Sequence, residues 1–314
     1  LAERGRTAEP ERSELDMADV RGLELPRLAV EVMVAGGHHL LLHGPSGSGK
    51  TMLADRVVGL LPDLDDARAL EVAKIHDAWT RRAPVRVPPQ SVSVVELLGG
   101  EGRPGEFSLA HGGVLVLDEL PEFADDCLEA LRLPIEDGSV RLTRDGSASL
   151  WPARFSLLAT MRSCSCGQGC CSKAAVRRYQ AKVSGPILDR MDLVVPVDGP
   201  TATRPSERGE PSSAIRARIA LARERQRQRL RGTPWSCNAE LPASGQAIVQ
   251  LCPADPEVER WLADAGHRMP MSTRTMLRLR RVAQTIADLD LERDPRLPLG
   301  IEPFATAERL RQLP

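Results

Sequence analysis

The chain has 314 residues, of which 42% are hydrophobic, 27% charged and 3% aromatic, and its formal net charge is −1. This balance is typical of a soluble globular protein and excludes a fibrous or disordered chain. Because the net charge is small, any contact with nucleic acid has to come from a local basic patch. No apolar run reaches the roughly 20 residues that a membrane span needs, so we expect a cytoplasmic protein with no membrane partner.

The chain divides into three stretches. Residues 1–16 are charged and without periodicity, which predicts a flexible linker. In residues 17–200 apolar runs alternate with helical patterns, which predicts an α/β core with a parallel sheet. Strand patterns disappear in residues 201–314, so we expect a helical domain there, with the boundary near 198–206. The chain begins with Leu1 instead of methionine, which indicates a fragment of a longer protein.

The expected elements follow from periodicity and from turn residues. In chain order they are a helix at 25–35, a strand at 39–43, a helix at 51–61, a strand at 114–117, a helix at 128–135, a β-hairpin at 139–150 around Asp145-Gly146, strands at 155–160 and 193–197, and helices at 212–231 and 271–289. The continuous apolar run at 114–117 is typical of a strand that is buried on both faces of a parallel sheet.

A phosphate-binding motif follows the first expected strand. It fits the pattern GxxxxGK[ST], and its residues are Gly44, Pro45, Ser46, Gly47, Ser48, Gly49, Lys50 and Thr51. Glycines let backbone N–H groups surround phosphate oxygens, and the following helix adds its N-terminal dipole. We therefore expect ATP to bind here, with Lys50 on the β and γ phosphates and the Thr51 hydroxyl on Mg²⁺. A chance glycine turn is the alternative, and the flanking strand and helix argue against it.

Two carboxylates, Asp118 and Glu119, end the strand expected at 114–117. Asp118 is placed to hold Mg²⁺, and Glu119 is placed to orient and deprotonate the attacking water. A carboxylate pair after a strand is by itself structural about half the time. The catalytic interpretation therefore depends on the phosphate loop.

Arg190 lies just before the last expected strand. From there its guanidinium would reach the γ-phosphate held by a neighbouring subunit and stabilise the transition state as an arginine finger. Spacing alone favours an ion pair with Asp189 or Asp192 instead.

A series of short segments along nearly the whole chain matches one family in order. They lie at residues 19–22, 35–38, 44–51, 103–106, 109–111, 116–123, 128–132, 136–138, 152–155, 184–192 and 280–289. On these segments the chain resembles the magnesium chelatase-like AAA+ ATPases of the YifB type, a family that includes the competence protein ComM.

The resemblance implies a five-stranded parallel AAA+ core, a helical lid and a homo-hexameric ring with ATP between subunits. It favours the finger role for Arg190 and implies a sensor 2 role for Arg274, as a lid arginine that contacts the γ-phosphate. The hairpin would point toward the central pore, where Arg141 and Arg144 would follow a DNA backbone. The family's amino-terminal domain, which is similar to the Lon protease fold, has no counterpart in this sequence.

Two segments depart from the family pattern. Where the family has an asparagine after the sensor 1 strand, this sequence has Arg162, which cannot accept a proton from water but can contact phosphate. Slow hydrolysis would follow. The second departure is a shortened segment that holds four of the seven cysteines, Cys164, Cys166, Cys170 and Cys171. Four thiolates would suit Zn²⁺, although the spacing is tighter than in zinc knuckles, and free thiols are the alternative.

The arginine-rich stretch at 216–231 has two interpretations, a surface that faces DNA and a solvated helix face paired with Glu224. For the whole chain the leading hypothesis is an ATP-driven ring motor on DNA, with helicase-like branch migration of recombination or transformation intermediates. The first alternative is a chelatase-type motor that remodels a protein partner. The second is a scaffold that binds ATP, assembles and hardly turns over, and Arg162 is the residue that favours it.

Overall fold

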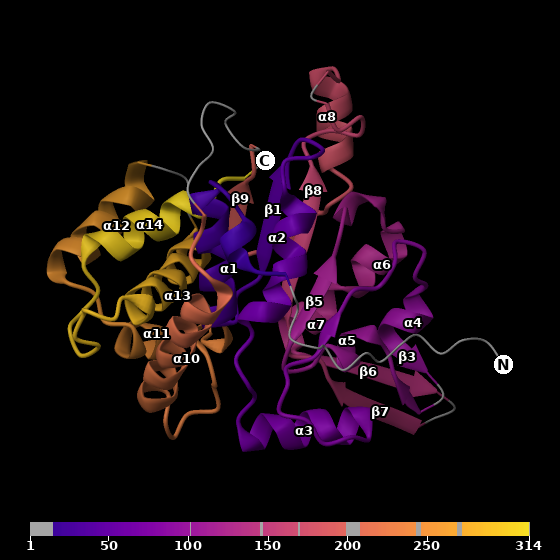
Figure 1. Ribbon diagram of the computed structural model, residues 1–314, viewed down its shortest axis with the longest axis horizontal. Coiled ribbons are helices and arrows are strands. Elements are labelled where there is room, and N and C mark those ends of the chain that lie inside the picture. The colour runs from indigo at the N-terminus through magenta and orange to yellow at the C-terminus, as the bar shows by residue number, and fades with distance from the viewer. Residues whose placement is uncertain are drawn as a thin grey trace.

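A computed structural model describes residues 15–100, 102–144, 147–168, 170–198, 208–242, 246–268 and 272–313. Its main sheet has five strands in the order β2-β5-β8-β1-β9, and all neighbours are parallel (Figure 1). The strands are β1 Leu40–Gly44, β2 Val85–Arg86, β5 Val114–Leu117, β8 Ser156–Arg162 and β9 Leu193–Pro196. The predicted five-stranded parallel α/β core is therefore confirmed.

Nine α-helices of the described residues belong to the part of the chain that holds the sheet. They are α1 Glu24–Gly36, α2 Lys50–Arg56, α3 Asp66–His76, α4 Val94–Leu98, α5 Glu106–Leu109, α6 Asp125–Ala130, α7 Arg132–Asp137, α8 Lys173–Gln180 and α9 Gly185–Leu188. The helix that follows the sheet, α10 Ser212–Arg229, packs beside α1. Short 3-10 helices lie at Met17–Asp19, Val57–Leu60 and Leu120–Glu122, and a small antiparallel pair joins β3 Gly99–Gly100 to β4 Arg103–Pro104.

Two predicted helices are shorter than expected. The helix predicted at 51–61 changes to a 3-10 turn at Val57, where two β-branched residues and Gly59 have low helix propensity. The helix predicted at 128–135 is split into α6 and α7, and Pro134 lies in the first turn of the second one. Proline is tolerated in a first turn but not in a helix interior, which favours a new helix start at this point.

The predicted hairpin is present as an antiparallel pair, β6 Ser139–Arg144 with β7 Ser147–Pro152. It extends to Pro152, two residues beyond the prediction, and its expected turn at Asp145-Gly146 lies outside the described residues. The hairpin lies on the side of the molecule away from the carboxyl-terminal helices (Figure 1).

Past the sheet the described chain is helical, as predicted. After α10 it forms α11 Gln246–Leu251, α12 Pro256–Arg268, α13 Thr273–Leu289 and α14 Ile301–Arg309, with a 3-10 turn at Asn238–Glu240. These helices gather on the β9 side of the sheet (Figure 1). Most of the predicted boundary at 198–206 and most of the predicted linker at 1–16 lie outside the described residues. Of the linker, Asp16 is ordered and caps the Met17–Asp19 turn through a bond from Ala18 N of 2.7 Å.

The sheet and the carboxyl-terminal helices share one hydrophobic core. Val32 of α1, Leu42 of β1, Ile219 of α10 and Val282 of α13 are all fully buried in the same cluster. A buried polar contact runs across it as well, since Gln226 Nε2 donates to Ala35 O at 3.0 Å. The helical part is therefore packed on α1 and not separated from the sheet by solvent.

In the parts of the chain that are described, no helix has both the length and the apolar character required to cross a bilayer.

Candidate nucleotide site

The predicted phosphate loop lies between the end of β1 at Gly44 and the start of α2 at Lys50. Gly47 and Gly49 have φ values of 75° and 102°, which a residue with a side chain rarely adopts. At Gly44 a Cβ would lie 2.1 Å from the carbonyl oxygen of Val197. The glycines of the motif are therefore required by the backbone, and the loop has the strand-loop-helix context that phosphate binding needs.

Lys50 folds back over this loop. Its ammonium donates to Gly44 O at 3.0 Å, to Pro45 O at 2.6 Å and to Ser48 Oγ at 3.3 Å. Burial lowers the pKa of Lys50 from its usual value, while Glu119 and Asp118 act in the opposite direction. A buried ammonium held only by neutral oxygens fits a site whose anion is supplied by a ligand, and the triphosphate of ATP provides one.

Asp118 lies directly opposite Thr51. The Thr51 hydroxyl is 3.3 Å from each of the two carboxylate oxygens of Asp118. Hydroxyl and carboxylate oxygens are the ligands that Mg²⁺ takes in proteins, so the pair that the sequence assigns to Mg²⁺ is chemically suited to it. The structure adds a third residue, Thr160 of β8, whose hydroxyl donates to Asp118 Oδ1 at 2.6 Å and accepts from Glu119 N at 2.9 Å. The sequence signal for Thr160 was a polar residue near the end of a buried strand.

Glu119 has a left-handed backbone, with φ of 58°, which is uncommon for a residue other than glycine. Its carboxylate is paired with Arg162, whose Nη2 lies 3.1 Å from Glu119 Oε2 and 2.6 Å from Glu122 Oε1. The guanidinium also lies 6.0 Å from the ring centroid of Tyr179. Arg162 therefore neutralises the expected catalytic base in this state of the protein.

Arg190 and Arg274 do not lie at the phosphate loop. Both line a cavity of about 1030 Å³ whose wall includes His39, Ser156 and Asp192. Those three residues stand at the amino ends of β1, β8 and β9, whereas the loop follows the carboxyl end of β1. Since a five-residue strand spans about 16 Å, the two arginines lie at the opposite edge of the sheet from the bound phosphate expected in the same chain.

Neither carboxylate proposed from spacing is the partner of Arg190. Its Nη2 pairs with Glu136 at the end of α7, and its Nη1 donates to Pro186 O at 2.9 Å. Asp192 instead is buried and lies 3.0 Å from Arg281 Nη2 and 3.4 Å from His38 Nδ1. These contacts hold the pKa of Asp192 far below its usual range despite its burial, which acts to raise it. Asp192 is therefore a structural anchor between the sheet and α13.

The arginines of α10 are mostly bound within the chain. Arg218 pairs with Glu31 and Glu210, and Arg229 pairs with Asp288. Others donate to backbone carbonyls, as Arg223 does to Val34 O at 2.8 Å. These contacts do not support the interpretation of this helix as a surface that faces DNA. Glu224, the expected partner in the solvated alternative, pairs with Arg227 and accepts from Gln228 Nε2 at 3.0 Å. Sequence periodicity missed the packing role because these long side chains lie over α1 and α13.

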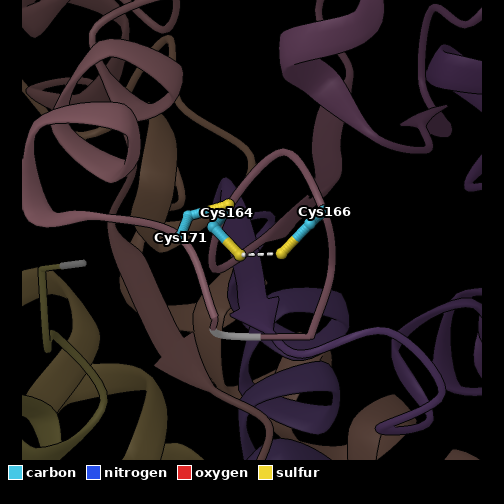
Figure 2. A group of neighbouring side chains, drawn as sticks. All are labelled: Cys164, Cys166 and Cys171. Atoms are coloured by element: carbon cyan, nitrogen blue, oxygen red, sulfur yellow. Dashed lines mark hydrogen bonds between the residues drawn. The ribbon is translucent and has the colours of Figure 1, made fainter.

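Four cysteines gather directly after β8, and Figure 2 shows three of them, Cys164, Cys166 and Cys171. The sulfurs of Cys164, Cys166 and Cys171 all lie within 4.8 Å of one another, and Cys170 Sγ is 3.4 Å from Cys166 Sγ. The N–H of Gln168 donates to Cys166 Sγ and, together with the neighbouring thiols, lowers the pKa of Cys166 to about 5. No second group of histidines, cysteines or carboxylates with such short separations occurs among the described residues.

Comparison with known families gives two matches along the chain. Residues 16–204 match the family described as magnesium chelatase, subunit ChlI, and residues 209–298 match the carboxyl-terminal domain of the same subunit. The first match contains the phosphate loop, the acidic pair and Arg190, and the second contains Arg274.

Individual relatives cover most of the chain. YifB of Escherichia coli (strain K12) is 42% identical over 88% of this chain, and YifB of Salmonella typhimurium is 40% identical over 88%. The competence protein ComM of Haemophilus influenzae is 36% identical over 90%. The chain spans only 57% to 58% of the length of these three proteins.

Proposed function

Since this chain belongs to the magnesium chelatase ChlI family of AAA+ ATPases, we propose that it is the motor part of a ring-forming ATPase that moves DNA. The activity proposed is helicase-like, the branch migration of recombination or transformation intermediates driven by ATP hydrolysis. The proposal concerns the whole protein, because the relatives YifB and ComM are longer than this chain.

One observation supports a ring above all. The chain carries Lys50, Asp118 and Glu119 at the carboxyl edge of the sheet, and it carries Arg190 and Arg274 at the amino edge. A single subunit cannot bring these two sets of groups to one phosphate. If the amino edge of one subunit contacts the carboxyl edge of the next, each interface holds a complete site, and a heterologous contact of this kind closes into a ring. We propose that the ring is a hexamer.

Within such an interface each residue has a defined task. Lys50 and the loop N–H groups bind the phosphates, and Thr51 and Asp118 would hold Mg²⁺, which when bound spreads the phosphate charge. Glu119 orients the attacking water and takes its proton. Arg190 and Arg274 of the neighbour stabilise the charge that develops on the transferred phosphoryl group. Before Glu119 can accept a proton, its carboxylate has to leave the ion pair with Arg162.

The role on DNA has two supports. The relative ComM is named a competence protein and is 36% identical to this chain. The β6–β7 hairpin carries Arg141, whose side chain is exposed and whose backbone lies opposite Leu150 in the strand register. An exposed cation on a hairpin that faces a central pore would contact a phosphate backbone. Arg144 is the second candidate on this hairpin, and its side chain is outside the described residues.

The test is the rate of ATP hydrolysis with and without branched DNA. We expect branched DNA to stimulate turnover and Arg141→Ala to reduce that stimulation without changing the rate in the absence of DNA. The control is Arg132→Ala, since Arg132 is partly exposed but lies on α7 and pairs with Glu129. A rate that is indifferent to DNA would favour the chelatase-type motor instead. Assembly on ATP with hardly any turnover would favour the nucleotide-gated scaffold, for which the Arg162–Glu119 pair is the supporting observation.

A further inference from the structure

Three of the four clustered cysteines, Cys164, Cys166 and Cys171, lie close enough together for one tetrahedral thiolate site, and Cys170 lies beside Cys166. With a Zn–S distance of about 2.3 Å, the sulfurs of a tetrahedral site stand roughly 3.8 Å apart. Here Cys166 Sγ lies 3.2 Å from Cys164 Sγ and 3.4 Å from Cys170 Sγ. Cys171 Sγ lies within 4.8 Å of both Cys164 Sγ and Cys166 Sγ. Figure 2 shows the side chains of Cys164, Cys166 and Cys171 meeting inside one turn of the chain.

The same arrangement argues against paired disulfides. A disulfide joins two sulfurs about 2.05 Å apart and leaves no role for a third. Cys166 has two other sulfurs at almost equal distances, so the cluster has one centre and not two pairs. The backbone N–H of Gln168 also donates to Cys166 Sγ at 3.4 Å, and such outer hydrogen bonds accompany metal-bound ligands.

This cysteine loop, residues 164–171, is in contact with the phosphate loop. Ser46 N donates to Gly167 O at 2.8 Å, so the cysteine loop occupies one N–H of the phosphate-binding motif. The contact is close, because a Cβ on Gly167 would lie 3.0 Å from Ser46 Cβ. On its other side the cysteine loop accepts a bond of 3.1 Å from Arg162 Nη1 through Ser165 O.

Arg162 in turn pairs with Glu119. A short series of contacts therefore joins the cysteine loop both to the phosphate loop and to the acidic pair. The loop between the cysteines is short and rich in small residues, and among the described residues it contains no regular secondary structure. Such a segment needs an additional constraint to keep one conformation against the phosphate loop. A metal ion at the shared centre of the sulfurs supplies that constraint.

We propose that Cys164, Cys166, Cys170 and Cys171 bind one Zn²⁺ ion, and that this ion fixes the cysteine loop against Ser46 and Arg162 in the nucleotide site. The thiols release their protons to solvent when the ion binds, and no oxidant or reductant is involved.

Metal content is the first measurement, made on the full chain purified without added metal or chelator and without nucleotide. We expect about one zinc per chain, and a large loss of zinc in the double variant Cys166→Ser with Cys170→Ser, both of which replace exposed side chains. The control Cys127→Ser alters a cysteine outside the cluster and should keep its zinc. Co²⁺ exchanged into the wild-type protein should show thiolate charge-transfer bands and tetrahedral d–d bands, which needs no variant.

The contact with Ser46 is tested by hydrogen exchange. Removal of zinc with a chelator should speed exchange in a peptide that contains the Ser46 N–H by about tenfold or more, because its acceptor is the Gly167 carbonyl. A peptide from α3 serves as the control and should exchange at the same rate with and without zinc.

Two results would overturn the proposal. The metal site is excluded if the purified protein contains no zinc and binds none when zinc is added. Thiol titration that finds seven free thiols, or mass spectrometry that finds a disulfide within the cluster, would then show the state of the cysteines. The link to the nucleotide site is excluded if zinc leaves and exchange at Ser46 does not change. Neither readout uses ATP, so each can fail or succeed independently of the proposed ATPase activity.

Discussion

Arg162 Nη2 lies 3.1 Å from Glu119 Oε2, so an arginine is paired with the carboxylate that is expected to activate the water. The strand register explains why it is there. Arg162 ends β8 and is the Cα partner of Gly44, the first residue of the phosphate loop. Arg162 is thus fixed beside the phosphate loop by sheet pairing and beside Glu119 by charge.

The first prediction concerns this pair. Arg162→Asn should raise the basal rate of ATP hydrolysis, because it frees the Glu119 carboxylate while keeping a polar group at the position. An ion pair of this exposure contributes at most about 1 kcal/mol, so we expect an increase of no more than about fivefold. Arg81→Asn is the control, since Arg81 pairs with Asp66 on α3 and should leave the rate unchanged. A fall in the rate would show that Arg162 contacts phosphate during turnover.

The second prediction separates the two carboxylates that share Arg162. Glu119→Gln should retain ATP binding and lower turnover by at least about 100-fold, because an amide cannot take the proton of the attacking water. Glu122→Gln should lower turnover by less than about threefold, since Glu122 lies in the 3-10 turn after the strand and only supports the arginine. Nucleotide affinity and single-turnover rates measure the two effects separately. Equal losses in both variants would contradict the role assigned to Glu119.

The third prediction tests which edge of the sheet completes the site. Lys50→Ala should abolish nucleotide binding, and Arg190→Ala should abolish turnover while leaving binding intact. When the two inactive proteins are mixed, about a quarter of interfaces in randomly assembled rings combine an intact phosphate loop with an intact arginine, so activity should reappear. The same mixing experiment with Arg274→Ala should also restore activity, because Arg274 lies in the cavity at the amino edge. Failure of the Arg274 mixture would place that arginine in its own subunit's site.

The fourth prediction concerns stability in acid. Burial lowers the pKa of His39 from 6.5 to about 4. Between those values the unfolded chain binds the proton and the folded one does not, so the free energy of unfolding should fall as pH decreases from about 6.5 to about 4. The shift corresponds to at most about 3 kcal/mol for this histidine. Denaturant unfolding at several pH values measures the slope, which should be shallower in His39→Gln. An unchanged slope in that variant would assign the effect to the other buried histidines, such as His38.

Much of the sheet could be predicted because its strands are apolar on both faces. The strand at 114–117 matches β5 in full, and those at 39–43, 155–160 and 193–197 match β1, β8 and β9 within two residues. The fifth strand, β2, was not assigned to any residues, because a two-residue strand has no periodicity to detect. Local patterns therefore found the elements that carry the phosphate loop and the acidic pair.

Contacts between distant segments could not be read in the same way. Thr160 reaches Asp118 only because β5 and β8 are neighbours, and Arg190 meets Glu136 only because α7 lies at the same edge as the amino end of β9. The sequence offered Asp189 and Asp192 as nearer partners for Arg190, and proximity along the chain was a poor guide. Strand order decides these pairs, and it depends on the whole fold.

The shared core of α1, α10 and α13 has a consequence for how this protein unfolds. Because Val32, Ile219 and Val282 are fully buried in one cluster, removing the residues after 200 would uncover apolar surface on α1. A truncated chain that ends before α10 should aggregate instead of forming a smaller nucleotide-binding unit. Heating the intact chain should likewise melt both parts in a single calorimetric peak, with equal calorimetric and van't Hoff enthalpies.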